Sequence, residues 1–413
     1  MAIHTHTDII DVCIVGAGLS GVYAAYLLQG YSVAVFDARC RVGGRLLTAE
    51  EQGGVDLGGS WIWPRSEYVM TRFVDQLRIE TVDQYVNGES FVRTSDGKRL
   101  SIPPGEASRY IACGGGAVRV SSGAASIVHT LLQNDKHDTH DNLSIHLGMR
   151  VVGIEHGGDV MRVIYEAEET NNKVGTKSIR CRAAILAAPP KVLANSIRFH
   201  PPLPKIKIDS MLATPTWMED YGKVAVSFPQ NWWRRLNMSA VSIDQKGPVS
   251  TWWESCSGND GDGLYPTLSG FVTATGAKDL QKLENSEALH DHVMDSLTDI
   301  YAIDAAEMGM QLDAVGVKIN GSADTHGISV MKGGIIVSYK SWLKDCHTNS
   351  PPSEVVDFAC DYGDVNLQRS VGSLFFAGTE TSHGSGHMEG AIVSAQRAAE
   401  EVLQYLRLLG TTG

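Results

Sequence analysis

The N-terminal segment changes from an apolar run to a glycine-rich turn and then to a helical pattern. Residues 9–15 ("IIDVCIV") form a mostly apolar run with the length of a buried parallel strand. A Gly-x-Gly-x-x-Gly turn over 16–21 follows, and small apolar residues then recur at helical spacing over 22–28. Residues 31–38 predict a second strand, which ends at Asp37. The pattern therefore predicts a β-α-β unit.

The C-terminal region shows the same order of apolar run, glycine-rich loop and helix. Residues 373–380 ("SLFFAGTE") predict a last strand. The segment 389–409 is strongly helical, and its alanines allow close packing. His387 stands where this helix begins, at the end of the glycine-rich loop.

Each part of the N-terminal turn suits the binding of a dinucleotide. Gly16 permits the tight turn, Gly18 lets backbone N–H groups approach a pyrophosphate, and Gly21 lets the helix pack close to the strand. The helix N-terminus supplies partial positive charge for the phosphates. Asp37, sixteen residues after Gly21, is placed to accept hydrogen bonds from ribose hydroxyls. This unit alone does not separate NAD from FAD.

Two later stretches favour a flavin. "ARCRVGGRLLT" places arginines and a glycine pair directly after the acid, which suits further contacts to phosphate and to a ribityl chain. "VDLGGSWIWP" places two glycines beside a bulky aromatic, which indicates backbone lying against a flat ring. A nicotinamide enzyme has no need of these features.

Composition narrows the class of protein. The chain has 413 residues, of which 43% are apolar, and a formal net charge of −12, with no block of Lys or Arg. This argues against a nucleic-acid or membrane partner. The seven cysteines are scattered without a C-x-x-C pair, which indicates reduced thiols and a cytoplasmic protein rather than a disulfide framework or a metal site. No apolar run has the length of a membrane span, and we expect no secretory signal.

Taken together, the motifs resemble the flavin-containing amine oxidase family, the monoamine oxidase and polyamine oxidase group. The strongest matches are "VGAGLSG", "DARCRVGGR", "VDLGGSWI" and "LFFAGTETSHGSGHMEGA", with weaker ones at "AAILAAPP", "YGKVAVSFPQNWW" and "LSGFVTATGAKDLQKL". The resemblance implies an α/β fold: a discontinuous Rossmann-like FAD-binding domain, plus an α+β substrate domain with a mixed sheet. We place the FAD-binding domain at 1–83, 114–208 and 353–413, and the substrate-binding domain at 84–113 and 209–352.

The resemblance also implies roles for individual residues. Lys223 reaches the reactive flavin nitrogen through a water, Trp342 lies near the flavin, and His387 contacts the substrate or lines its pocket. The expected catalytic residues are thus Lys223, His387 and Trp342. The expected FAD-binding residues are Gly16, Gly18, Leu19, Ser20, Gly21, Asp37, Ala38, Arg39, Arg41, Gly44, Arg45, Gly58, Gly59, Ser60, Trp61, Val152, Gly378, Glu380, His387 and Met388. We expect no metal.

The implied activity is oxidation of an amine to an imine, which water hydrolyses to an aldehyde or ketone, with dioxygen reduced to hydrogen peroxide. Two alternatives stay open: a flavin desaturase or dehydrogenase acting on C–C bonds, and a non-catalytic flavoprotein. The amine stays open among primary, secondary, polyamine and amino acid. An amino acid needs a carboxylate partner, for which Arg234 and Arg235 are candidates.

Three departures from the family pattern carry further expectations. First, the facing aromatic pair of monoamine oxidases is absent: its later member falls at His387, and its earlier position falls near Pro351 and Pro352. Second, no cysteine occupies the covalent flavin position, since Cys346 is out of step, so FAD is expected to bind non-covalently. Third, the segment 84–113 is short and the apolar C-terminal tail of membrane-anchored members is missing. The active site is then less enclosed, or a second subunit of a homodimer covers it.

Overall fold

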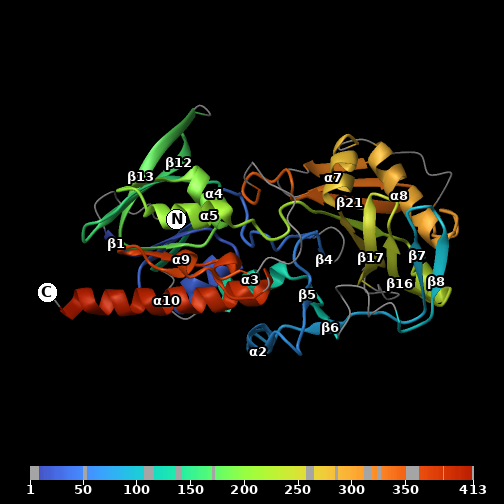
Figure 1. Cartoon of the computed structure of the whole chain (residues 1–413), viewed down its shortest axis with the longest axis horizontal. Helices are drawn as coiled ribbons and strands as arrows, with labels where there is room; N and C mark the ends of the chain where they lie inside the picture. Colours follow the sequence, from blue (N-terminus) through green and yellow to red (C-terminus); the bar gives the residue numbers. More distant parts are fainter. Residues whose placement is uncertain are drawn as a thin grey trace. The chain divides into compact units, whose positions relative to one another are not determined.

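The structure is a computed structural model in which two compact units are built from interleaved segments. It describes residues 9–49, 54–106, 116–134, 142–169, 173–256, 265–283, 287–310, 318–322, 327–349, 362–384 and 386–411. Unit 1 comprises 1–45, 127–217 and 350–413, and unit 2 comprises 46–126 and 218–349. Both units are visible in Figure 1, where labels identify the elements of each.

Unit 1 is organised around an eight-stranded sheet of order β10-β2-β1-β13-β12-β11-β14, with β22 also paired to β13. The strands are β1 (Ile9–Val15), β2 (Val33–Phe36), β10 (Leu143–His146), β11 (Val151–Glu155), β12 (Met161–Glu169), β13 (Lys173–Leu186), β14 (Arg198–His200) and β22 (Leu374–Phe376). Strands β10, β2, β1, β13 and β22 run parallel, whereas β12 is antiparallel to both of its neighbours. The buried residues of these parallel strands are nearly all apolar, as expected for strands that are covered on both faces of the sheet.

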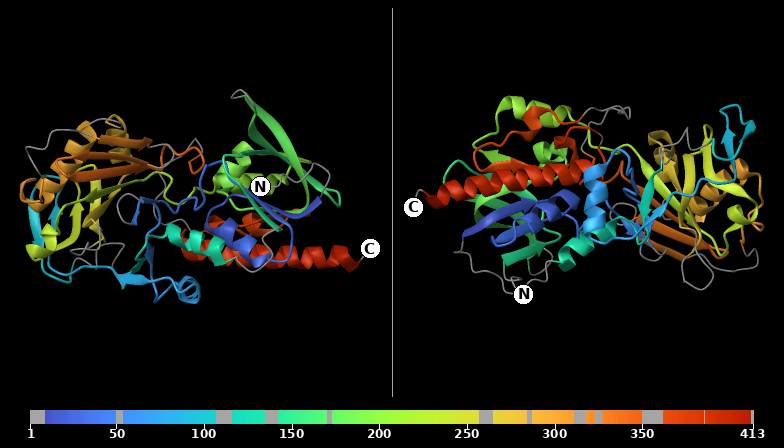
Figure 2. Two further views of the ribbon diagram at one scale, coloured as in Figure 1. Left: turned by 180° about the vertical axis from the view of Figure 1, so that it is seen from behind. Right: turned by 90° about the horizontal axis from the view of Figure 1, so that it is seen from below.

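Helices of unit 1 connect and cover these strands. They are α1 (Leu19–Leu27), α3 (Ala125–Asn134, whose first two residues belong to unit 2), α4 (Pro190–Ser196), α5 (Lys205–Ala213), α9 (Val365–Gln368), the 3₁₀ turn η4 (Thr379–Thr381) and α10 (Met388–Thr411). The long helix α10 packs along α1, which Figures 1 and 2 show from several sides. Ala395, Ala398 and Ala399 of α10 are buried, so the close packing predicted for these alanines is confirmed.

Unit 2 is built on a nine-stranded mixed sheet of order β19-β20-β21-β15-β18-β17-β16-β7-β8. Its strands are β7 (Glu89–Arg93), β8 (Arg99–Ile102), β15 (Gly222–Ser227), β16 (Met238–Asp244), β17 (Val249–Cys256), β18 (Thr267–Val272), β19 (Lys318–Ser322), β20 (Gly327–Lys332) and β21 (Ile335–Ser341). All pairings are antiparallel except β16 with β7, which is parallel.

Smaller elements complete unit 2. Short strands β3 (Thr48–Ala49) and β4 (Val55–Asp56) pair with each other, and β5 (Trp61–Ile62), β9 (Val118–Val120) and β6 (Thr81–Asp83) form a third sheet. The helices are α2 (Tyr68–Gln76), α6 (Trp232–Arg235), α7 (Ala274–Gln281) and α8 (Glu287–Tyr301). Four tryptophans, Trp232, Trp233, Trp252 and Trp253, are fully buried.

The predicted fold class is confirmed, with a Rossmann-like β1-α1-β2 unit in one part and a mixed sheet in the other. The contact-based units differ from the predicted domain limits at 46–83 and 114–126, which pack with unit 2. Trp217, which we placed in the substrate domain, lies in unit 1. The assignment of each unit to cofactor or substrate stays a prediction.

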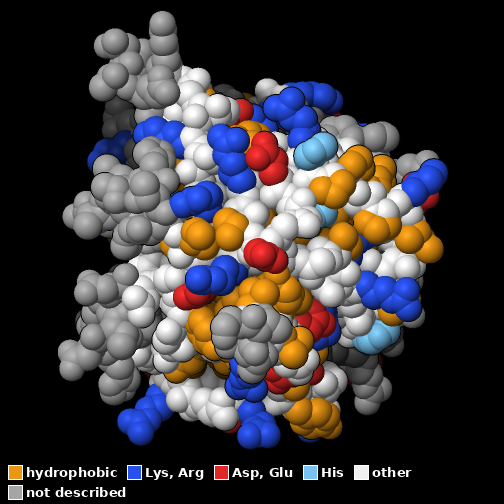
Figure 3. Space-filling view, turned by 90° about the vertical axis from the view of Figure 1, so that its left-hand side faces the viewer, with side chains coloured by type: hydrophobic (Ala, Val, Ile, Leu, Met, Phe, Trp, Pro, Cys, Tyr) orange, Lys and Arg blue, Asp and Glu red, His pale blue; other side chains and the backbone are white. Residues whose placement is uncertain are grey.

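The surface of unit 1 carries both signs of charge. In Figure 3 basic and acidic side chains are interspersed, with hydrophobic side chains between them. Within the described residues, no helix is both long enough and apolar enough to traverse a membrane.

Candidate active site

The glycines of the first turn have the close contacts that the sequence predicts. Gly16 has φ +108°, and a Cβ there would lie 2.8 Å from the carbonyl oxygen of Ala187. A Cβ on Gly21 would lie only 1.9 Å from the carbonyl oxygen of Gly16, which shows how tightly α1 sits on β1. At Gly18 the nearest atom to an added Cβ is the Cα of Gly44, 3.9 Å away. The turn is therefore closed at Gly16 and Gly21 and open at Gly18.

Asp37 follows β2 and is buried beside this turn. Its Oδ2 accepts a hydrogen bond from the Ala17 N–H at 2.7 Å, and its Oδ1 accepts one from the Arg39 N–H at 2.8 Å. A carboxylate offers about four lone-pair sites, so these two bonds leave acceptor capacity for ribose hydroxyls. The backbone contacts fix the carboxylate, and the predicted ribose contact stays a prediction.

The loop after Asp37 folds back against the turn. Gly18 pairs with Gly43 through an isolated parallel bridge, and Gly44 has φ +57°. The guanidinium of Arg41 donates to the carbonyl oxygens of Val42 at 3.1 Å and Gly44 at 2.8 Å. Arg41 therefore braces the loop itself, and its predicted phosphate contact stays a prediction.

Glu380, at the far end of the sequence, forms a buried ion pair with Arg45. Arg45 donates from Nη1 to Oε1 at 2.7 Å and from Nη2 to Oε2 at 3.0 Å, and the side chain of Glu380 is fully buried. The backbone N–H of Trp217 donates a third hydrogen bond to Oε1 at 3.1 Å. Residues predicted separately from both ends of the chain are thus brought together in unit 1.

Gly378 connects β22 to η4 with φ +117°, a conformation that favours glycine. Its N–H donates to Oγ of Ser394 at 3.0 Å, and Ser394 lies 3.4 Å from Oγ of Ser20 on α1. The hydroxyl of Thr379 donates to the carbonyl oxygen of His387 at 2.8 Å. The predicted strand 373–380 therefore ends at Phe376, and the rest forms a turn held against α1 and α10.

His387 directly precedes α10, as predicted, and is half-buried. Its ring makes an edge contact with the indole of Trp217, with centroids 5.4 Å apart. Gly386 is required here, because a Cβ would lie 2.4 Å from Cγ of Trp217. Met388, the first residue of α10, is buried. Sequence reasoning missed Trp217, since nothing local to it indicates that it meets residue 387.

In unit 2, Lys223 on β15 is buried with 3% of its surface exposed. Its Nζ donates to the carbonyl oxygen of Gly58 at 2.9 Å and to Oγ of Ser60. It also lies 5.2 Å from the ring centroid of Trp253. A solvated lysine at a strand start is therefore excluded, and three residues of the predicted site lie together.

The surroundings of Lys223 lower the pKa of its amine toward neutral pH. Burial lowers the pKa of Lys223 to about 8, opposed by the charge of Asp56 and assisted by that of Arg119. Burial raises the pKa of Asp56 to about 6, although Lys223, Thr48 and the Ala124 N–H favour its charged form. Neither Asp56 nor Arg119 was among the predicted site residues, because only the fold reveals their burial.

The segment from Gly58 to Trp61 is anchored on both sides. Gly59 is exposed, and Trp61 donates from its indole nitrogen to Oε1 of Gln84 at 2.9 Å. Trp342, on the other flank, donates from its indole nitrogen to the carbonyl oxygen of Leu57 at 3.0 Å. The predicted residues of this stretch therefore share one region of unit 2 with Lys223.

Other predicted residues have different outcomes. Val152 lies on β11, two residues after the 146–150 segment, whose backbone hydrogen-bonds to Asp37 and Arg39. Arg234 donates to Glu254 through two bonds of 2.8 and 2.6 Å, and Arg235 donates to Oε1 of Gln230 at 3.3 Å; a contact of either arginine with a substrate carboxylate stays a prediction. The position near 352, where the first aromatic of the facing pair in monoamine oxidases was expected, lies outside the described residues.

Within the described ranges, no group of three or more His, Cys, Asp or Glu side chains is arranged to bind a metal ion.

The described residues fit FAD. The N-cap of α1 is Gly18, which makes no side-chain cap, and the first turn contains no acidic residue. No side chain of the first turn therefore caps or neutralises its first backbone N–H groups, which suits a pyrophosphate. Gly18 leaves the space that an approaching phosphate needs.

Comparison with known proteins agrees with this geometry. The family model for flavin containing amine oxidoreductase matches residues 106–403, and that for an NAD(P)-binding Rossmann-like domain matches 14–77. Amine oxidase [flavin-containing] B of Bos taurus is 25% identical over 490 residues, covering 95% of this chain and 86% of that protein. Amine oxidase [flavin-containing] A of Sus scrofa is also 25% identical, with coverages of 96% and 85%.

Solved structures share the fold. Cyclohexylamine oxidase from Brevibacterium oxydans has a TM-score of 0.69 at 19% identity, covering 97% of this chain and 100% of that one. Wild-type putrescine oxidase bound to putrescine has a TM-score of 0.66 at 18% identity, with coverages of 96% and 99%. The flavin containing amine oxidoreductase model spans well over half of the chain and includes Glu380, and the Rossmann-like model covers the glycine turn at 16–21. The chain therefore belongs to the family of flavin-containing amine oxidoreductases, with FAD as its cofactor.

Proposed function

We propose that this protein oxidises an amine to an imine and passes the two electrons to dioxygen, forming hydrogen peroxide. The imine is then hydrolysed, so that one amine, one dioxygen and one water give one carbonyl compound, one ammonia or smaller amine, and one hydrogen peroxide. The observation that carries the proposal is Lys223, a buried amine held by Gly58 and Ser60 with a pKa of about 8. When bound, FAD supplies the two-electron acceptor for this oxidation.

The residues of unit 1 are assigned to binding and orientation. The uncapped N-terminus of α1 and the backbone at Gly18 hold the pyrophosphate, and Asp37 accepts from the ribose. Glu380 is held in place by Arg45. Its Oε2 has a second lone pair, which accepts a hydrogen bond from a hydroxyl of the ribityl chain. The backbone N–H groups at the start of α10, after His387, stabilise negative charge on the bound cofactor.

Lys223 transfers a proton through its Nζ in this proposal. Dioxygen needs two protons as it accepts two electrons, and a group whose pKa lies near neutrality both delivers and regains a proton easily. Burial is what lowers the pKa of Lys223, while Asp56 keeps the charged form accessible. A solvated lysine, with a pKa near 10.4, would release its proton far less readily at neutral pH.

We further propose that the substrate is an amine without an α-carboxylate. A carboxylate needs a cationic partner, and of the two candidates the charge of Arg234 is already balanced by Glu254, while Arg235 is exposed; both observations support the proposal. The names of two similar structures, cyclohexylamine oxidase and putrescine oxidase, make a cyclic monoamine and a short diamine the first compounds to test. His387 beside Trp217 is the proposed substrate contact.

The test uses the purified holoenzyme under anaerobic conditions. Cyclohexylamine, benzylamine, putrescine, phenylalanine and a polyene are added separately, and loss of the visible absorption of oxidised flavin is followed. Air is then admitted, and peroxide is measured with a coupled peroxidase. We expect an amine to bleach the flavin and to yield peroxide. Bleaching by the polyene alone would replace the proposal by a desaturase, and bleaching by no compound would favour a non-catalytic flavoprotein.

The role of His387 has its own measurement. In His387→Ala, contact with the substrate predicts a higher KM or a lower kcat for the best amine. An unchanged kcat together with an unchanged KM would remove His387 from the substrate site.

Two further properties complete the proposal. FAD binds non-covalently, supported by Cys346 lying exposed and out of the family's covalent position; acid precipitation should release all yellow colour into the supernatant. The protein resides in the cytoplasm, supported by Cys13 and Cys181, whose thiols interact in the core of unit 1 without a disulfide. Cell fractionation should therefore recover the protein with cytosolic markers.

A further inference from the structure

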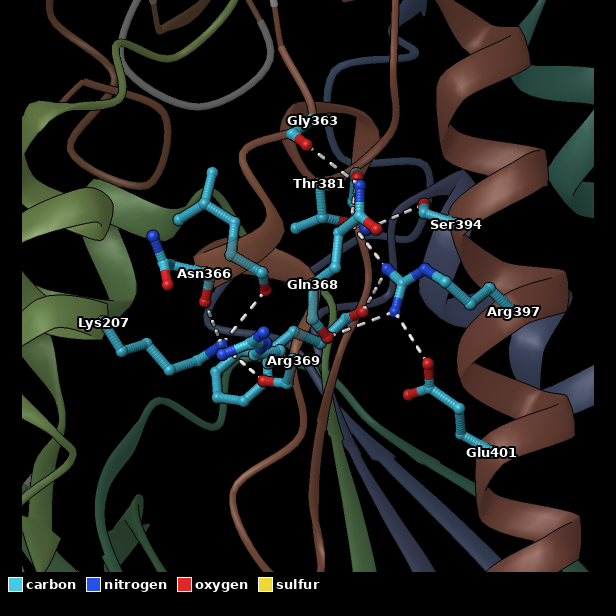
Figure 4. A network of polar contacts seen from close by, with 12 residues as sticks. Lys207, Gly363, Asn366, Gln368, Arg369, Thr381, Ser394, Arg397 and Glu401 are labelled. Atoms are coloured by element: carbon cyan, nitrogen blue, oxygen red, sulfur yellow. Dashed lines mark hydrogen bonds and ion pairs between the residues drawn. The ribbon is translucent and has the colours of Figure 1, made fainter.

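Behind the turn that carries Gly378 and Glu380, unit 1 contains a network of polar contacts centred on two cations (Figure 4). Arg397 projects from α10, and Lys207 projects from α5. Neither residue belongs to the motifs that identify the family site, and neither is assigned a role by the proposed reaction. Their contacts converge on the backbone between α9 and η4.

Arg397 joins the two ends of the turn. Its Nη2 donates to the carbonyl oxygen of Phe376, the last residue of β22, at 2.8 Å. The same nitrogen donates to Oγ1 of Thr381, the last residue of η4, at 3.1 Å. Gly378 and Glu380 lie between these two anchor points. A single guanidinium nitrogen therefore sets the separation of the ends of the turn.

The other nitrogen of Arg397 reaches backward. Nη1 donates to the carbonyl oxygen of Gln368, at the end of α9, and to Glu401, one turn along α10, both at 3.3 Å. Gln368 in turn donates from Nε2 to the carbonyl oxygen of Gly363 at 3.1 Å. Arg397 is thus held in place by its own helix and by the segment that precedes β22, as Figure 4 shows.

Lys207 secures the same segment from the opposite side. Only 3% of its surface is exposed, and its Nζ donates to the carbonyl oxygens of Asn366 at 2.8 Å, Leu367 at 3.1 Å and Arg369 at 2.7 Å. Nζ also lies 3.4 Å from the ring centroid of Phe376. An ammonium has three donors and no acceptor, so three carbonyl oxygens at a helix end match it fully.

We propose that Arg397 and Lys207 are positioning residues for the bound cofactor: they hold Phe376 from its carbonyl and from its ring, and so fix the turn that presents Gly378 and Glu380 to FAD. This inference rests on the proposed assignment of that turn to the cofactor. A loop binds a ligand most tightly when its supporting contacts are already formed, because binding then has no entropy cost for ordering the loop. Glu380 is fully buried, so a turn that shifts would carry its carboxylate away from Arg45 as well.

The experiment measures FAD binding to the apoprotein by the change in flavin fluorescence, for wild type, Arg397→Met and Lys207→Met. The control is Arg162→Met on β12, which removes another arginine of unit 1 whose ion-pair partner, Glu155, is remote from the turn in sequence and exposed. We expect Arg397→Met to raise the Kd for FAD about 10- to 100-fold, by the loss of two charge-assisted bonds. Lys207→Met should raise it several-fold, and Arg162→Met should leave it unchanged.

A double-mutant cycle separates positioning from general stabilisation. If Arg397 acts through the turn, its effect on the Kd shrinks when Glu380→Gln has already removed the group that the turn presents. Additive effects on the Kd would mean that Arg397 acts only on overall stability, and would overturn the inference. Thr381→Val provides a milder version. It removes one acceptor of Arg397, together with the hydrogen bond that the Thr381 hydroxyl donates to the carbonyl oxygen of Gly378 at 2.8 Å, and leaves both cations in place; it should raise the Kd several-fold.

The outcomes distinguish the two levels of the argument. Failure of the wild-type apoprotein to bind FAD would refute the proposed function. Normal binding by wild type together with an unchanged Kd in Arg397→Met or, if that variant does not fold, in Thr381→Val would refute the positioning role alone.

Discussion

Replacing Gly21 with alanine tests whether contact between α1 and β1 sets the cofactor cradle. The added Cβ would lie 1.9 Å from the carbonyl oxygen of Gly16, where real Cβ contacts are at least 3.0 Å. The helix or the turn must therefore move by the difference, 3.0 minus 1.9, or 1.1 Å. Cγ2 of Ile14 at 3.3 Å closes another direction of movement.

Two effects of Gly21→Ala oppose each other. Alanine is a better helix former than glycine by about 1 kcal/mol, which favours the variant. Overpacking a tight interior costs about 1 to 3 kcal/mol, and here the obstructing atom is backbone, which cannot rotate away. Because backbone obstructs the added Cβ, the upper part of that range, about 2 to 3 kcal/mol, applies; subtracting about 1 kcal/mol for helix propensity leaves a net destabilisation of about 1 to 2 kcal/mol in urea unfolding of the apoprotein.

The effect on FAD should be larger than the effect on stability. A displaced N-terminus of α1 weakens at least one charge-assisted bond to phosphate, worth about 1.5 to 3 kcal/mol, which corresponds to a Kd raised about 10- to 150-fold. Titration of FAD fluorescence with apoprotein measures this. The control is Gly158→Ala, at a glycine with ordinary φ and its nearest neighbour 3.9 Å from the added Cβ. A Gly21→Ala variant as stable as wild type with an unchanged Kd would refute the reasoning.

Three other changes have defined outcomes. Lys223→Met should slow the reaction of the reduced holoenzyme with dioxygen about 100-fold, which lies in the range of general acid–base effects and is measured by stopped-flow absorbance. Lys177→Met, at an exposed lysine, should leave this rate unchanged. Equal rates in Lys223→Met and wild type would show that Lys223 takes no part in proton transfer. Burial lowers the pKa of Lys207 to about 7, so between about pH 7 and 10 the unfolded chain binds a proton that the native protein lacks, and native stability rises with pH. The urea-unfolding free energy of wild type minus that of Lys207→Met should then grow by about 2 to 3 kcal/mol from pH 7 to 9, and a flat or falling difference would contradict the burial of this amine. Gly386→Ala would place a Cβ 2.4 Å from Cγ of Trp217, so KM for the best amine should rise at least about five-fold and tryptophan emission should shift; unchanged values of both would show that the indole relaxes without consequence.

Much of the cofactor region followed from local sequence rules. β1 runs from Ile9 to Val15 as the apolar run predicts, and α10 begins at Met388, one residue before the predicted helix. Gly16 was predicted to permit the tight turn, and its φ of +108° is a conformation that favours glycine. These features depend on residues within a few positions of one another, so the sequence alone specifies them.

The contacts that complete the candidate site depend on residues far apart in the chain. Glu380 meets Arg45 across 335 positions, and Lys223 meets Gly58 across 165. Family resemblance pointed to Glu380 and Lys223, and also to Arg45, Gly58 and Ser60, as site residues, but it did not predict which of these residues pair with one another. Composition alone would have left Lys223 in solvent, since lysines are mostly exposed.

The amino-acid sequence by itself determined the dinucleotide-binding unit and the helix at the other end, because periodicity and glycine conformation act locally. Tertiary structure alone decided that Trp217 packs on His387, and that Arg397 and Lys207 brace the turn behind Glu380. The reason is that burial and pairing of a side chain depend on which distant segments return beside it, and no short stretch of sequence contains that information.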